Sequence, residues 1–158
     1  MSKLEKQIKT ILFTNGSFCQ GNHALESIAE KIKLEFEMEE DADTLIGDTP
    51  RSHLYRVWHA TRAFDSGLRL FLEKFGRVPA LPNQHSLGGY INALQNGVTA
   101  ATPYLQLDGN TATDIHREVV DKRNVYAHVA GKMPTKTEAN FVIGKILQYY
   151  IQIYSLEK

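Results

Sequence analysis

The C-terminal segment from Ala139 to Leu156 constrains the fold most strongly, because it is apolar on nearly every side of a helix. Lys145 is its only charged residue between those two ends. Such a helix must be covered over most of its surface. We therefore expect it to be central in a helical bundle, or to have one face covered by a second subunit. Interspersed polar residues, such as Gln148 and Gln152, make it too polar to span a membrane.

The rest of the chain also has helical periodicity. The pattern predicts an opening helix that ends at Asn15-Gly16 and a second helix that begins after an Asn22 N-cap. A long third helix is expected over 52–75, with Trp58 in its apolar seam and Gly76 as C-cap. Three further helices are expected: one over 81–97, one capped by Thr113 or Asp114, and a last one capped by Thr135 or Thr137. No run of alternating β-branched residues lies between turn pairs. The sequence therefore predicts an all-α fold of four main helices with one or two extra N-terminal helices.

Two domain-level expectations follow from the same pattern. Residues 1–49 form an N-terminal helical extension packed on the bundle, and residues 50–158 form the bundle domain. Residues 98–110 read as a connecting loop. The stretch 35–48 holds seven acids and no base, and we interpret it as a solvated face and loop.

Composition narrows the compartment and the partners. The formal net charge is zero, so no global field attracts nucleic acid and RNA binding would need a local patch. Cys19 is the only cysteine, which excludes an internal disulfide and a cysteine-rich zinc site and fits a reducing, cytoplasmic compartment. The first fourteen residues lack the continuous apolar core of a signal peptide.

The hexapeptide Arg123-Asn124-Val125-Tyr126-Ala127-His128 carries the clearest chemical signal. Cutting RNA without metal requires a group that removes the 2′-hydroxyl proton, one that neutralises the phosphorane oxygens and one that protonates the leaving 5′-oxygen. Histidine suits proton transfer near neutral pH. Arginine suits the phosphate, since its planar fork donates two parallel hydrogen bonds. In a two-fold dimer, two arginines and two histidines would face one another across a groove.

The spacing of Arg123 and His128 raises a geometric difficulty. On a regular helix, five positions separate side chains by roughly 140° around the axis and about 7.5 Å along it. The pair converges only if Arg123 reaches round the helix or the helix is distorted. Asn124 lies closer to the face of His128, where it would orient the imidazole or contact phosphate.

Neighbouring residues extend this candidate site. Five bases and two acids between residues 115 and 136 give a local charge of +3, which is a modest phosphate-attracting patch. Lys122 and Lys132 belong to it and are candidate substrate-binding residues. Tyr126 would stack on a base or pack inside the protein. His116, two turns before Arg123, would line the same groove.

The hexapeptide resembles the Arg-x4-6-His signature of the HEPN (higher eukaryotes and prokaryotes nucleotide-binding) superfamily, above all its bacterial defence and abortive-infection branches. The resemblance covers roughly residues 50–156 and includes the Gly/Pro turn and the apolar helix after the motif. It implies an up-and-down four-helix bundle that dimerises through its motif helices. It also implies a metal-independent, cofactor-free endoribonuclease that leaves a 2′,3′-cyclic phosphate, with Arg123 and His128 catalytic and Asn124 supporting.

Other readings remain open. One toxin branch of the superfamily has a tyrosine two residues after the histidine, where an antitoxin modifies it. This chain has Ala130 there, which puts that regulation in doubt. A non-catalytic HEPN module that binds RNA, nucleotide or a partner protein is the main alternative, and a helical scaffold with a coincidental motif is another. The RNA target and any antitoxin or sensor protein are not identifiable from the sequence.

Overall fold

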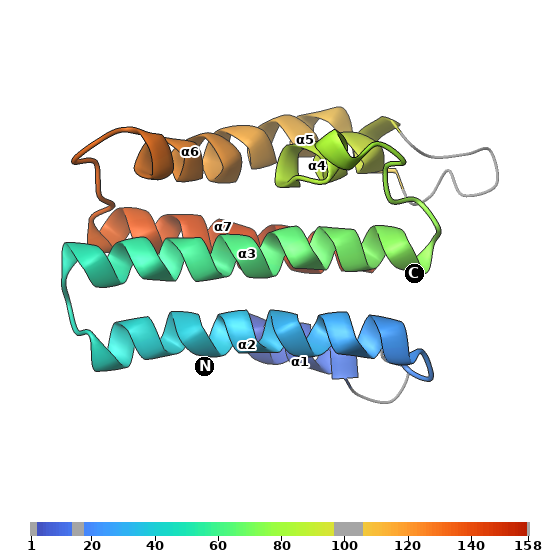
Figure 1. The fold of residues 1–158 in the computed structure, drawn as a ribbon, viewed down its shortest axis with the longest axis horizontal. Coiled ribbons are helices and arrows are strands. Elements are labelled where there is room, and N and C mark those ends of the chain that lie inside the picture. The colour runs from blue at the N-terminus through green and yellow to red at the C-terminus, as the bar shows by residue number, and fades with distance from the viewer. Residues whose placement is uncertain (1–2, 14–17, 97–105, 158) are drawn as a thin grey trace.

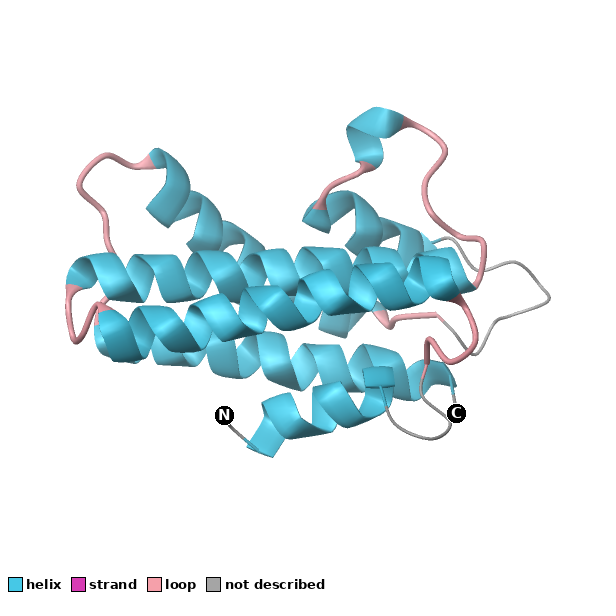
Figure 2. Ribbon diagram, turned by 60° about the horizontal axis from the view of Figure 1, so that its bottom comes forward, coloured by secondary structure: helices cyan, strands magenta, loops and turns pink. Residues whose placement is uncertain are grey.

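The computed structural model describes residues 3–13, 18–96 and 106–157 of the chain. Within these ranges all regular structure is helical and no strand occurs (Figure 2). The predicted all-α class is confirmed. The helices, in chain order, are α1 (Lys3–Phe13), α2 (His23–Leu45), α3 (Pro50–Lys74), the 3₁₀ turn η1 (Pro82–Gln84), α4 (Leu87–Asn96), α5 (Gly109–Ile115), the π-helical turn η3 (His116–Val120), α6 (Asp121–His128), α7 (Lys136–Tyr154) and the 3₁₀ turn η4 (Ser155–Glu157).

Capping residues explain where the three longest helices begin. The Asn22 side chain accepts hydrogen bonds from the backbone N–H groups of Ala24 and Leu25, as predicted for the start of α2. Thr49 and Thr135 each form a capping box at the start of α3 and α7. Thr135, not Thr137, is therefore the cap of the last helix.

Two predicted boundaries are wrong. The helix before the hexapeptide begins at Gly109, because Asp108 rather than Thr113 or Asp114 accepts the backbone N–H of Thr111, at 2.9 Å. The predicted helix over 81–97 is divided into η1 and α4. The expected stop at Asn15-Gly16 and most of the expected loop over 98–110 lie outside the described residues.

The glycine pair at the start of α4 has a local explanation. A Cβ on Gly89 would lie 2.0 Å from the carbonyl oxygen of Gln84 in η1. The chain therefore folds back onto its own turn at this point. The partner of this close approach is the preceding turn η1 rather than another helix.

Helix α3 lies in the middle of the molecule (Figure 1). It packs against α2 on one side and against α7 on another, while α4 and α6 contact it from the third. One core cluster joins these helices, and it includes Ile8 and Leu12 of α1 and Ile32 and Phe36 of α2. Helices α1 and α2 thus share one core with the helices that follow, and the expected boundary falls in the turn between α2 and α3.

Helix α7 is covered on most sides, as its sequence required. It contacts α3, α1 and η3, and nearly all of its large apolar side chains are buried. The exceptions are Phe141, which is 42% exposed, and Ile151, which is half-buried. Among the described residues, no helix is long and apolar enough to cross a membrane.

The acidic stretch 35–48 differs from the prediction of a solvated face. Glu35 and Glu39 on α2 are buried at the contact with α3. Glu39 accepts a hydrogen bond from Nε of Arg56 at 2.7 Å, and Glu35 pairs with His59 and Arg62. The basic partners are on α3, so a local count of charge in α2 could not identify them.

The contact between α3 and α7 depends on a glycine. A Cβ on Gly67 would lie 2.3 Å from the hydroxyl oxygen of Tyr150, whose ring is buried, and the Tyr154 hydroxyl donates to the Gly67 carbonyl at 2.8 Å. A Cβ on Gly144 of α7 would meet nothing within 4 Å.

We therefore expect opposite effects from two glycine-to-alanine substitutions. Gly67→Ala should lower the free energy of unfolding by roughly 1–3 kcal/mol, because the buried ring must move. Gly144→Ala should raise it by about 0.5–1 kcal/mol through helix propensity alone. Urea unfolding followed by circular dichroism measures both. A Gly67→Ala protein as stable as Gly144→Ala would contradict the tight α3–α7 contact.

Candidate functional site

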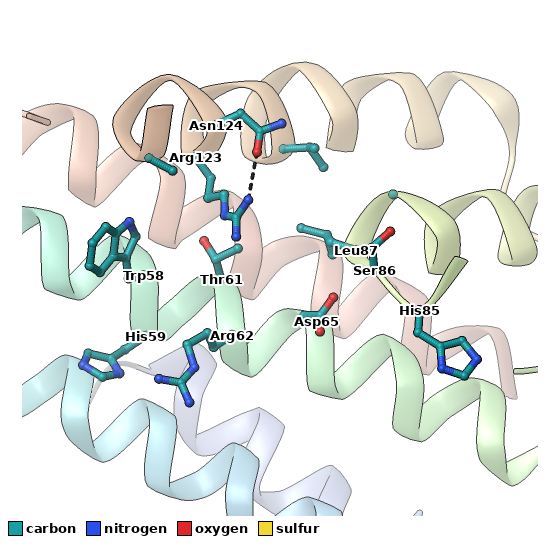
Figure 3. Close-up of a pocket in the computed structure, with 13 residues that line it drawn as sticks. Trp58, His59, Thr61, Arg62, Asp65, His85, Ser86, Leu87, Arg123 and Asn124 are labelled. Carbon is teal, nitrogen blue, oxygen red and sulfur yellow. Dashed lines mark hydrogen bonds between the residues drawn. The ribbon is translucent and has the colours of Figure 1, made fainter. Parts of the chain in front are cut away.

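A cleft of about 650 Å³ opens between α3, α6 and the start of α4 (Figure 3). It is large enough for a small organic ligand or one or two nucleotides. Its walls combine cationic, aromatic and imidazole side chains with one carboxyl group. The residues that line it are Trp58, His59, Thr61, Arg62, Asp65, His85, Ser86, Leu87, Gly88, Val120, Arg123, Asn124 and Ala127.

Arg123 reaches from α6 across this cleft. Its side chain extends toward Thr61 on α3, and its Nη1 donates to Oδ1 of Asn124 at 2.9 Å (Figure 3). Asn124 thus positions the guanidinium, a role that the sequence did not specify. The motif arginine is exposed and presents its remaining N–H groups to the cleft.

His128 does not line the cleft with Arg123. It is the last residue of α6 and is exposed. The helix is regular from Asp121 to His128, and the only distortion nearby is the π-helical turn before it. That turn leaves the spacing within the hexapeptide unchanged. In one chain, therefore, the two motif side chains face different parts of the surface.

The π-helical turn has an anchor on α7. The backbone N–H of Asp121 donates to the carbonyl of His116, five residues back. Glu118, inside this turn, accepts a hydrogen bond from the Tyr149 hydroxyl and pairs with Lys145 at 3.1 Å. These contacts also lower the pKa of Glu118. Such turns are frequent at functional sites. Because a π-helical turn holds an extra residue, this one changes which side chains of α6 lie in line with the buried side chains of α5.

The four predicted substrate-binding residues do not line the cleft. Lys122 approaches the Phe141 ring, with 5.7 Å between Nζ and the ring centroid. Tyr126 is half-buried against the core, and burial raises its pKa. The His116 ring lies beside Gly88 of α4, and Lys132 is exposed in the turn after α6.

The local patch of +3 is weaker than the sequence suggested. Arg117 pairs with Asp114 at 2.6 Å and lies 3.5 Å from Glu118. Lys136 pairs with Asp48 at 2.9 Å, which raises the pKa of the lysine. The positive charge available to an anion in the cleft comes instead from Arg123, because Arg62 on α3 is paired with Glu35 at 2.9 Å.

Sequence reasoning did not identify Trp58, Thr61 and Asp65 as residues of the α3 wall of the cleft. Trp58 was placed in the apolar seam, but it is 39% exposed and faces the cleft. Thr61, Arg62 and Asp65 follow it at spacings of three, four and seven residues, which place all four on one side of a helix. The sequence did contain a signal for this wall, because charged residues interrupt the apolar seam on this side of the helix.

His59 and Arg62 share one carboxylate on α2. Nδ1 of His59 lies 2.8 Å from Oε2 of Glu35, and Nη2 of Arg62 lies 2.9 Å from Oε1. Because a carboxylate only accepts, Nδ1 of His59 carries the hydrogen of this contact, and Nε2 is the ring nitrogen that Glu35 does not engage. A carboxylate that orients a histidine in this way suits it for proton transfer.

Asp65 is the one carboxyl group in the wall of the cleft. Burial raises its pKa, and the charges of Arg123 and Arg69 oppose that rise. Among the described residues, no hydrogen bond or ion pair within 4.0 Å engages its oxygens. Its two acceptors are thus available to a ligand.

No family model, curated protein or solved structure matches this chain. Within the described residues, no group of three or more His, Cys, Asp or Glu side chains is placed to hold a metal ion.

Cys19 lies far from this chemistry, in the core. Burial raises its pKa from 9.0 to about 11. At pH 8 the thiolate fraction of Cys19 should consequently be roughly a hundredfold lower in the folded protein than in the unfolded chain. We expect a thiol reagent such as DTNB to modify the folded protein at least a hundredfold more slowly than the urea-unfolded chain. Equal rates in the two states would show that Cys19 is accessible and reactive.

Proposed function

We propose that this protein is a metal-independent endoribonuclease of the HEPN type that works as a homodimer in the cytoplasm. The observation that carries the proposal is Arg123, held by Asn124, with its guanidinium in a cleft large enough for one or two nucleotides. This arrangement suits a phosphodiester, because arginine forks bind phosphate oxygens in pairs. In this reading α3, α4, the continuous α5–α6 helix and α7 are the four up-and-down helices, and α1 and α2 are additions.

In the proposed reaction, RNA supplies its own nucleophile. A base removes the proton of the 2′-hydroxyl, and its oxygen attacks the adjacent phosphorus. The guanidinium of Arg123 neutralises the charge that accumulates on the phosphorane oxygens. An acid then protonates the departing 5′-oxygen, which leaves a 2′,3′-cyclic phosphate and a 5′-hydroxyl. Two imidazoles suffice as base and acid, and no metal enters these steps.

The exposed surface of α6 supports the dimer. No residue of α6 is fully buried, which is unusual for a helix in a compact domain. Val125, Val129 and Met133 are each more than 40% exposed at this end of the molecule, and Phe141 lies nearby under Lys122. In the proposed dimer, a second copy covers this apolar patch (Val125, Val129, Met133, Phe141). A toxin or phage-defence role, with an antitoxin or a sensor protein as regulator, follows only from the family resemblance.

One observation favours the alternative of a non-catalytic module that binds RNA or nucleotide. His128 is outside the cleft that contains Arg123. If no second copy completes the site, the cleft would bind a phosphate without cutting the chain. Binding without cleavage is therefore the outcome that would select this alternative.

The chemistry is tested by RNA cleavage in EDTA. We expect cyclic-phosphate ends from the parent protein and at least a hundredfold slower cutting by His128→Ala, the range for loss of a general acid or base. His23→Ala is the matched control, since His23 is also an exposed histidine, at the start of α2. Cutting by His128→Ala at the parent rate would remove His128 from the chemistry. Loss in His59→Ala instead would assign proton transfer to the histidine held by Glu35.

The dimer is tested separately by placing a charge in the apolar patch. Val129→Asp should convert the parent dimer to a monomer in sedimentation velocity and abolish cutting, because a buried carboxylate without a partner is costly. Leu45→Asp is the control, since Leu45 is 79% exposed at the end of α2. A Val129→Asp monomer that cuts at the parent rate would show that one chain contains the whole site.

A further inference from the structure

The α3 wall of the cleft has the geometry of a nucleobase-binding surface. Trp58 and Asp65 are seven residues apart, so they lie on nearly the same side of α3, about 10 Å apart along the axis. The Arg123 side chain descends toward Thr61, between them (Figure 3). An aromatic ring, a cation and a carboxyl group thus follow one another along the cleft.

An exposed tryptophan in the same cleft as Arg123 suits stacking of a base. Trp58 is on the surface although it is among the largest apolar side chains of the chain, and Tyr55 is its aromatic neighbour, with 6.2 Å between ring centroids. Proteins that bind single-stranded RNA stack splayed bases on such rings. Stacking itself is tolerant of base identity, so it does not select a sequence.

Asp65 supplies the group that would distinguish one base from another. A carboxylate is an acceptor only, and its two oxygens accept two parallel N–H groups. Guanine alone among the four RNA bases presents two adjacent donors, N1–H and N2–H, on its Watson–Crick edge. Within the described residues, Asp65 has no hydrogen-bond partner of its own, so binding a guanine would cost no internal contact.

We propose that the cleft reads single-stranded RNA, with Asp65 accepting the N1–H and N2–H groups of a guanine and Trp58 stacking the base next to it. The phosphate between the two nucleotides would then lie at Arg123. This inference takes RNA as the ligand from the proposed function, but it concerns recognition and has its own readout. It predicts cleavage next to guanosine wherever cleavage occurs.

The readout is tryptophan fluorescence, because Trp58 is the only tryptophan of the chain. The probes are three deoxytrinucleotides, d(AGA), d(AIA) and d(AAA), which lack the 2′-hydroxyl and cannot be cut. We expect d(AGA) to quench Trp58 in a saturable way. Inosine lacks the N2 amino group, so d(AIA) should bind about tenfold more weakly, and d(AAA) more weakly still.

Asp65→Asn should bind d(AGA) and d(AAA) with similar affinity, while Asp41→Asn should keep the preference of the parent. Asp41 is an exposed carboxyl group on α2 that does not line the cleft. The inosine probe removes the same hydrogen bond from the ligand side, so the test stands even if Asp65→Asn folds poorly.

Several results would overturn the inference. The first is that the parent binds d(AGA) and d(AIA) with equal affinity, and the second is that Asp65→Asn keeps the guanine preference. The third is that a labelled probe binds, as measured by fluorescence anisotropy, without any change in Trp58 emission. Guanine-selective binding without any RNA cleavage would remove only the ribonuclease proposal. Cleavage that ignores guanosine would remove only this inference.

Discussion

The contact between Gly67 of α3 and the buried ring of Tyr150 on α7 is the constraint on which the cleft depends. It fixes which side of α3 faces the apolar helix, since a side chain at position 67 would occupy the space of the ring. The ion pairs of Glu35 and Glu39 with α3 fix the side that faces α2. With two sides assigned in this way, Trp58, Thr61 and Asp65 are left on the third side, under α6. The candidate binding surface therefore consists of the α3 residues that face neither α2 nor α7.

The apolar pattern of the sequence was sufficient to predict the helices, but it did not predict which residues the polar side chains contact. Helix caps such as Asn22 act within a few residues, so the sequence predicted them from short-range rules. Thr113 was a reasonable cap by the same rules, yet Asp108 begins the helix earlier because its side chain reaches the N–H of Thr111. The burial of Glu35 depends on His59, which is 24 residues away, and local charge counts do not contain that information.

The candidate site was predicted in part for the same reason. Arg123 and Asn124 were named from the hexapeptide, and the structure brings both to the cleft. Trp58 and Asp65 were not named, because the meeting of α3 with α6 depends on the packing of α7 between distant segments. The π-helical turn, anchored by Glu118 to Tyr149, was also invisible to a periodicity that assumes a regular helix.

The separation of Arg123 from His128 can be reconciled with a shared chemistry only by a second copy of the chain or by another imidazole. Helix α6 is regular through the hexapeptide, so the 140° between the two side chains is built into one chain. His59 offers an imidazole on the same cleft, but Glu35 already engages its Nδ1 and only Nε2 can act on RNA. A cyclising cleavage needs both a base and an acid. One such imidazole from α3 and one from a partner's α6 would meet that requirement with Arg123 between them.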